Sequence, residues 1–453
     1  MSALVRRETG LMRGRAGWLA ALGLATLLAA GLGLGKSVAQ AQDAAPPSGS
    51  AADSAPAPSL LDRLGVDGSL RGGAWSSDRD LDDRTDFSTG SIWLRMAPKL
   101  SESWSAKLEG WAQGQGSQGD SRGRQELREA YVAYAGQDYD VRAGRQIVVW
   151  GRADQVNPTD NLGSRDFTLL FPEPDDLRRG SGMVRVGRAF AGATLTVVWL
   201  PEFRPNVYPV GALPPNIRLG EGEAPEQFDQ AAVKLDRTGG TVDWSASYFD
   251  GLDRNPDVAL QRIDATGVTL QLRYHRIRVV GADFAVNVGR FGLRGEAAYT
   301  DTADPTGSDP QLKNPYFFAV LGADRSFGDT LNLNVQLIHR ATASYRDPHS
   351  LADPLLRAVA IQNALAAGQL TPTQTGMSTR IGTKWLHETL EVELAAVGYF
   401  EKGDSLLRAK LLYHWTDTLR LTIGREAYDG PDESFFGRLR DNSVTFAELA
   451  YGY

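Results

Sequence analysis

Charged side chains recur at every second position in several apolar segments of this chain. Arg294 and Glu296 alternate with apolar residues in one segment, and a second segment repeats the pattern from Glu391. Because successive side chains of a β-strand point to opposite faces, such segments have one charged and one apolar face. Opposite charges on a shared face can set a field across a water-filled passage and select solutes. The predicted wall residues of that passage are Arg273, Arg294, Glu296, Glu391, Glu393, Arg408 and Lys410.

A second group of charges lies between residues 151 and 180, where six acids and four arginines fall within 30 residues. One interpretation is a solvated outer loop, since its Asn-Pro and Glu-Pro pairs favour turns. The other is a loop that folds into the passage and narrows it, with Leu169, Leu170 and Phe171 packed on the wall. The predicted constriction residues are Arg152, Asp154, Asp160, Arg165 and Asp166.

The elements that must position these charges are strands of about ten residues. Clear alternation occurs at 268–274, 293–299, 331–337, 392–396 and 407–415. A soluble sandwich shows the same alternation, but ten residues is the length of a tilted strand that crosses a bilayer. The sequence therefore predicts an all-β fold, a transmembrane antiparallel up-and-down β-barrel. We expect about 18 strands, within a range of 16–20, with short periplasmic turns and long extracellular loops.

The connections alternate in length, as such a barrel requires. Within the long connection 342–373, Asp353-Pro354 precedes an apolar run that predicts a short helix. The stretch 251–265 has room for a further strand. Long connections are expected at 76–89, 116–125, 151–180, 201–227, 301–314, 342–373 and 429–441.

The chain ends on an amphipathic strand whose last residue is aromatic. This ending resembles the signal by which outer-membrane barrels are recognised for assembly, so the barrel assembly machinery and outer-membrane lipid are expected partners. Aromatic residues also lie near segment ends, where interfacial girdles belong. The predicted assembly and girdle residues are Trp415, Tyr451 and Tyr453, and further predicted girdle residues are Trp93, Trp104, Trp111, Trp150, Trp199 and Trp244.

The N-terminal region predicts export. Residues 1–41 combine a basic start, the apolar stretch 17–34 and small residues before a cleavage site, which is typical of a signal peptide; an uncleaved anchor helix is the alternative. Residues 42–62 are rich in Ala, Pro and Ser and predict a disordered periplasmic leader, followed by the barrel at 63–453. Removing five basic residues and one acid with the signal takes the net charge from -7 to -11. That charge disfavours nucleic acid as a partner.

Enzyme motifs are absent from the sequence. None of the five histidines (275, 339, 349, 387 and 414) lies in an H-E-x-x-H spacing, and neither G-x-S-x-G nor a P-loop occurs. The chain has no Cys, which excludes disulfides, thiolate metal sites and a lipoprotein anchor. We therefore predict no catalytic residues, no metal and no cofactor. A Ser–His site on the barrel exterior is the remaining enzymatic alternative.

Several runs resemble a family of uncharacterised porin-like barrels in Gram-negative outer membranes. They lie at 144–151, 157–160, 199–204 and 274–299, while 127–132 is similar to a strand common in Gram-negative porin-like barrels. The resemblance implies an outer-membrane location and proximity to inner-membrane exporters of the resistance-nodulation-division type and periplasmic lipoproteins. It also implies traffic in lipid-like molecules. A weaker similarity is to the barrels that export alginate.

Two functions follow as expectations. The first is a porin-like channel that passes small solutes by diffusion through a charged, loop-constricted lumen. The second is the outer-membrane component of an exporter for lipid-like or polysaccharide cargo, with a plugged or gated barrel and periplasmic or inner-membrane exporter components as partners.

Overall fold

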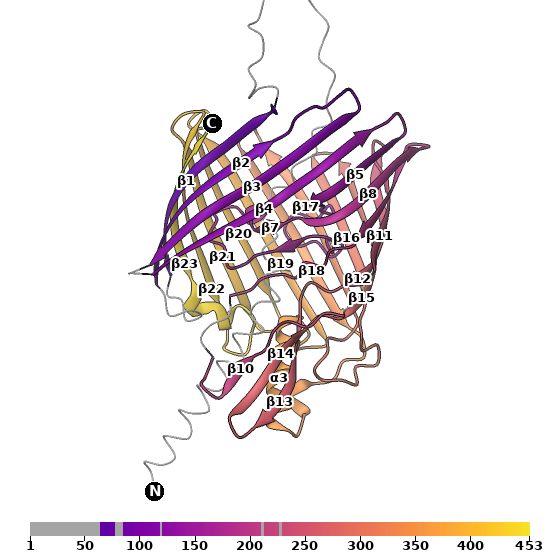
Figure 1. Cartoon of the computed structure of the whole chain (residues 1–453), viewed down its shortest axis with the longest axis vertical. Helices are drawn as coiled ribbons and strands as arrows, with labels where there is room; N and C mark the ends of the chain where they lie inside the picture. The colour runs from indigo at the N-terminus through magenta and orange to yellow at the C-terminus, as the bar shows by residue number, and fades with distance from the viewer. Residues whose placement is uncertain (1–63, 78–84, 118–119, 210–212, 226–228) are drawn as a thin grey trace, which may run out of the picture.

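Eighteen antiparallel strands form a single closed sheet (Figure 1). The last strand, β23 (Val444–Gly452), pairs with the first, β1 (Val66–Ser77), so the sheet has no open edge at its ends. In lipid backbone N–H and C=O groups need internal partners, and the pairing of β1 with β23 supplies them where the sheet closes. The predicted fold class and strand number are confirmed. The computed structural model describes residues 64–77, 85–117, 120–209, 213–225 and 229–453, so the predicted signal peptide and leader lie outside it.

Each strand pairs with its neighbours in chain order, which makes the topology up-and-down. The other barrel strands are β2 (Asp86–Met96), β3 (Trp104–Ser117), β4 (Asp120–Ala135), β5 (Tyr139–Gln146), β8 (Ser181–Phe190), β9 (Ala193–Leu200), β11 (Gln230–Arg237), β12 (Val242–Leu252), β15 (Arg276–Val288), β16 (Phe291–Asp301), β17 (Tyr316–Phe327), β18 (Leu331–Thr342), β19 (Thr373–Trp385), β20 (Leu390–Tyr399), β21 (Asp404–His414) and β22 (Leu419–Asp429).

The two ends of the barrel differ in their connections. One end, here called the turn end, carries short links such as 191–192 and 289–290, and the other, the loop end, carries long ones such as 147–180. In outer-membrane barrels the short turns face the periplasm. The prediction of a long loop at 116–125 is wrong, because β3 extends to Ser117 and β4 begins at Asp120. A helix long and apolar enough to span a bilayer is not found in the part of the chain that the structure describes.

Side chains alternate between the lipid-facing surface and the interior, as the period of two requires. Trp415, Tyr451 and Tyr453 are exposed on the outside by 64%, 48% and 49% of their surface, as expected for a girdle. The assignment of Trp93, Trp111 and Trp150 to the girdle is wrong, since all three are buried in the interior. Position near a strand end does not reveal the face, which depends on register.

A small cap projects beyond the loop end (Figure 1). It consists of a three-stranded sheet, β10 (Ile217–Leu219), β13 (Asp257–Asp264) and β14 (Gly267–Arg273), packed against α3 (Pro354–Ala366). The predicted helix is confirmed, and Asp353 caps it by accepting two backbone N–H groups.

The cap corrects one predicted wall residue. Arg273 lies at the end of β14, outside the barrel wall. The segment 268–274 alternates like a barrel strand, yet it pairs with β13 through a tight hairpin and with β10 in parallel. Alternation defines the two faces of a strand, but it does not say which sheet the strand joins.

A buried charge cluster joins the cap to the barrel. Lys313 Nζ lies 2.7 Å from Asp253 Oδ2, 2.8 Å from the Asn255 carbonyl oxygen and 3.6 Å from Asp257 Oδ1. Burial raises the pKa of Asp257 to about 7, although the Lys313 ammonium opposes that change. Burial alone would lower the pKa of Lys313, but Asp253 and Asp257 raise it overall.

Because the folded cap binds a proton on Asp257 that the unfolded chain releases at a lower pH, its stability should fall between about pH 4 and 7 and then level off. We expect the loss to be roughly 2–4 kcal/mol. Hydrogen exchange of residues 254–273 at pH 5 and pH 8 measures it. Asp257→Asn should abolish the difference, whereas the exposed Asp264→Asn should retain it; an equal pH dependence in both variants would contradict the assignment.

Candidate functional site

The interior of the barrel is crossed by the connection between β5 and β8, here called the constriction loop (residues 147–180). It contains β6 (Ser164–Arg165), the short helix η1 (Pro174–Leu177) and β7 (Arg178–Arg179), which lies inside the ring of strands (Figure 1). Asp154 reaches Arg380 on β19 at 2.7 Å, and Glu173 reaches Lys410 on β21 at 3.0 Å. The loop therefore spans the lumen and takes the inward course rather than that of a solvated outer loop.

One end of the constriction loop is held to the wall by a single carboxylate. Glu296 on β16 accepts the backbone N–H groups of Arg152 at 3.0 Å, Ala153 at 3.1 Å and Thr159 at 2.7 Å, and the Thr159 hydroxyl at 2.8 Å. Gly151 has φ +100°, and a Cβ there would lie 2.4 Å from a Glu296 oxygen, so only glycine fits. Glu296 was predicted to face the open passage; instead the loop covers it.

The predicted constriction residues all lie in the lumen, and each is paired with an opposite charge. The Arg152 guanidinium contacts Asp283 and lies 2.8 Å from Asp236. Asp160 lies 2.9 Å from Arg178, and 3.7 Å from Arg165. Asp166 is 3.4 Å from Arg124 on β4. Buried charges need such partners, because an unpaired one would cost several kcal/mol.

Aromatic packing holds the middle of the constriction loop. Phe171 stands edge-on to Trp93 and Trp111, with ring centroids 5.2 and 5.3 Å away. Leu170 packs in a neighbouring apolar cluster with Trp75. The predicted packing of Leu169, Leu170 and Phe171 on the wall is confirmed, since all three are buried.

Apolar side chains fill one side of the lumen. The cluster that contains Phe171 continues through inward-facing residues of β17, β18, β20, β21 and β22 to the connection that carries η3 (Gly437–Asn442). Phe436 and Leu439 from that connection are almost completely buried in it. On this side of the barrel a packed apolar core fills the lumen beside buried ion pairs such as that of Arg408 with Glu426.

A cavity of about 1400 Å³ occupies the other side of the lumen. Its lining extends from Thr241, in the turn before β12, to Asn255, just past the loop end of β12. The lining therefore includes residues at both ends of the wall. Its basic lining residues are Lys107, Arg128, Arg142, Arg152, Arg165, Arg178, Lys234, Arg254, Arg294 and Arg340, and its acidic ones are Glu109, Glu129, Asp154, Asp160, Asp175, Asp236, Asp243, Asp253 and Asp324. Ten cations against nine anions leave the lining nearly neutral.

The predicted wall residues have different environments. Arg294 lines the cavity, 3.4 Å from Asp324. Arg408 is buried against Glu426, and Lys410 is covered by Glu173 of the constriction loop. Glu393 lies 3.8 Å from Arg380 and 3.7 Å from Lys410, while Glu391 lies 3.9 Å from Lys384 and His414.

Sequence reasoning missed two acids that bind the loop, Asp236 and Asp283. Both lie on strands in which polar and apolar residues alternate, so the alternation could have identified them as inward-facing. No group of three or more metal-ligating side chains is arranged to hold an ion within the described ranges.

Comparison with known proteins now identifies the family. A family model described as a protein of unknown function, DUF1302, matches residues 70–451, most of the chain. The chain belongs to the DUF1302 family. No curated protein sequence matches it.

Solved structures similar to this DUF1302 chain include two Acinetobacter baumannii proteins, OccAB4 and OccAB1. Each has a TM-score of 0.50; they are 8% and 7% identical, and the alignments cover 86% of this chain and 97% and 95% of theirs. At such low identity the likeness establishes a shared fold, that of porin-like outer-membrane barrels.

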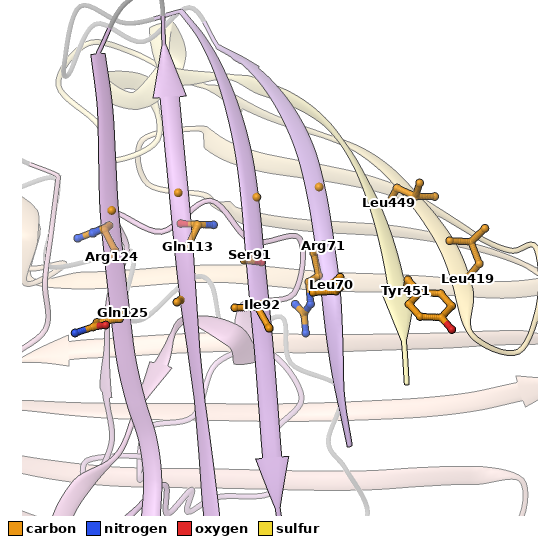
Figure 2. A pocket seen from close by; sticks show the side chains of 15 residues that line it. Leu70, Arg71, Ser91, Ile92, Gln113, Arg124, Gln125, Leu419, Leu449 and Tyr451 are labelled. Atoms are coloured by element: carbon orange, nitrogen blue, oxygen red, sulfur yellow. The ribbon is translucent and has the colours of Figure 1, made fainter. Parts of the chain in front are cut away.

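The outer surface of the DUF1302 barrel has a groove of about 1050 Å³ across β1 to β4 (Figure 2). Its floor is a row of four glycines in direct register, Gly72, Gly90, Gly114 and Gly123. A Cβ at any of them would meet no atom within 4 Å. The row beside it contains Leu70, Ile92, Ala112 and Gln125. The glycines therefore leave a shallow track on the lipid-facing side.

Proposed function

We propose that this DUF1302 protein is an outer-membrane channel that passes small polar solutes by diffusion. The cavity whose lining includes residues at both ends of β12 carries this proposal, because it offers a polar path along one side of the lumen. The porin-like fold supports it. The constriction loop and the apolar core restrict that path to one side of the lumen.

The charge pattern sets the proposed mechanism. Most cations in the lining are fixed by a carboxylate, as Arg152 is by Asp236 and Arg294 by Asp324. Paired charges on the wall give a transverse field that orients a polar solute without trapping it. Since the lining is nearly neutral, we expect weak selectivity between cations and anions and passage of zwitterionic or uncharged polar solutes.

Single-channel recording in a planar bilayer tests this function. The folded, heat-modifiable barrel should show steady open steps. Arg294→Ala should leave Asp324 unpaired in the cavity and shift the reversal potential in a salt gradient toward cations. Arg325→Ala is the matched control, since Arg325 lies in the same wall region but stacks on Phe291 and Phe327. A folded barrel that never conducts would refute the channel.

A second candidate is a gated or plugged barrel that serves an exporter with periplasmic or inner-membrane partners. The observations in its favour are the apolar core that closes one side of the lumen and the cap beyond the loop end. It predicts a silent barrel that copurifies with such partners, and so differs from the channel in both measurements.

A further inference from the structure

Strand β4 extends well beyond its pairing with β5. It pairs with β3 from Trp104↔Tyr134 to Ser117↔Asp120, but with β5 only over Ala130–Ala135. Between Asp120 and Glu129 no described strand pairs with β4 on its β5 side. The β3–β4 register shifts at Arg128, two residues from Ala130, where the pairing with β5 stops. Such an edge is unusual at the depth of a bilayer, where exposed backbone groups are costly.

The edge lies at bilayer depth. Leu127 of β4 is opposite Gly110, which is opposite Leu94 of β2, and both leucines are exposed on the outer face. They belong to the same lipid-facing belt as Val132, which is exposed on β4 nearer the turn end. The missing ladder therefore begins within the lipid-facing belt, at the level of Leu127.

Side chains close this gap in place of a backbone ladder. Glu126 of β4 lies between Arg204, at 2.7 Å, and Arg179, at 3.4 Å. The Arg128 guanidinium donates to the carbonyl oxygens of Arg178 at 3.1 Å and Asp175 at 2.7 Å. We call this contact between β4, the end of the constriction loop and residues 202–205 the polar seam.

The polar seam separates two cavities. The inner one is lined by Arg128 and Glu129 of β4, and also by Ile147 and Val149. The outer groove is lined by Gly123, Arg124 and Gln125 of the same strand. Along β4, only residues 126 and 127 separate the residues that line the outer groove from those that line the inner cavity. Figure 2 shows Gln125 at the edge of the outer groove, in one row with Ile92 and Leu70.

We propose that the polar seam is a lateral portal through which a single-chain amphiphile with a carboxylate head passes between the lumen and the outer membrane leaflet. The proposal rests on the channel function, because it uses the same inner cavity. The glycine track takes the hydrocarbon chain, since it is mostly apolar, lies on the lipid-facing side and reaches Gln125, the neighbour of Glu126. The head group takes the place of the Glu126 carboxylate between Arg179 and Arg204.

Two features favour this ligand. Two guanidinium groups that already share one carboxylate match a second carboxylate in geometry and charge. Ion pairs between side chains also exchange partners more easily than a backbone ladder, whose bonds break together. Passage therefore needs a rearrangement of Arg179 and Arg204 and no strand separation.

The test uses the native absence of Cys, which makes a double-cysteine variant unambiguous. The protein is placed in lipid nanodiscs with a diazirine-labelled stearate, and the photolabelled residues are identified by mass spectrometry. In the native chain we expect labels both at Gln125, outside, and at Ile147 and Val149, inside. In Glu126→Cys/Arg204→Cys bridged by a bifunctional thiol reagent, the inside labels should fall at least tenfold.

The control is Asp140→Cys/Arg185→Cys with the same reagent. These residues form a 2.9 Å ion pair on β5 and β8, where the ladder is complete, so the bridge should not change labelling. A water-soluble diazirine butanoate, which enters from the turn end, should label Val149 in both bridged proteins.

Two results would overturn the portal: labels confined to lipid-facing residues in the native chain, or inside labels that persist after the seam is bridged. Glu126→Gln provides a milder variant in case the bridged one misfolds, and it should raise inside labelling severalfold. Single-channel current recorded on the same preparations separates the two proposals. A barrel that does not conduct but shows inside labels that depend on the seam refutes the channel alone. A barrel that conducts but shows no such labels refutes the portal alone.

Discussion

Glu296→Ala should free one end of the constriction loop and raise the single-channel conductance severalfold, with larger current noise. The substitution leaves the N–H groups of Arg152, Ala153 and Thr159 without their acceptor. Each buried donor that loses its partner costs about 1–3 kcal/mol, so the docked position of the loop should lose most of its advantage. Planar-bilayer recording measures the change directly.

Glu391→Ala is the control for this prediction. Glu391 is also an inward-facing carboxylate on a barrel strand, but the ion-pair distances to Lys384 and to the His414 ring are both 3.9 Å, and both residues belong to the wall. Its removal should leave conductance within about twofold of the native value. Equal increases in both variants would show that loss of lumen charge, and not release of the loop, controls the current.

Phe171→Ala should destabilise the barrel by about 3–5 kcal/mol, the usual range for truncating a buried phenylalanine. Phe171 is 4% exposed and contacts two tryptophans edge-on, so its loss leaves a cavity between the loop and β2 and β3. Urea unfolding followed by tryptophan fluorescence and by heat-modifiable mobility measures the loss.

Phe400→Ala is the matched substitution on the surface, because Phe400 is 61% exposed. It should change stability by less than about 1 kcal/mol. If Phe171→Ala were equally mild, the constriction loop would be a loosely held segment and the apolar core would not fix its position.

The fold was predictable from the sequence because its main determinant is local. The period of two over about ten residues, with short and long links in turn, favours a closed barrel over a soluble sandwich. The helix in 342–373 could also be predicted, since Asp353 and Pro354 signal a helix start within a few residues. These features depend on neighbours along the chain.

The site was predictable only in part, because its contacts are long-range. Arg152 and Asp154 were recognised as constriction residues from their density of charge, but nothing local says that they bind Asp283 and Arg380. Glu296 was recognised as inward-facing, yet most of its partners are backbone N–H groups. Every residue except proline has such a group, so the sequence does not reveal them. Arg273 was assigned to the wrong sheet because β14 has the same alternation as a wall strand.

The pairing of β1 with β23 has a consequence for biogenesis. Gly68 and Tyr453 exchange two backbone hydrogen bonds, so the final ladder joins the first and last strands of the barrel. Contacts between such distant positions form slowly, since a long loop must close first. Until they form, β1 and β23 each present a bare edge that templates pairing with other chains. The lifetime of this unclosed intermediate, rather than the stability of the finished barrel, therefore determines how much protein is lost to aggregation during assembly.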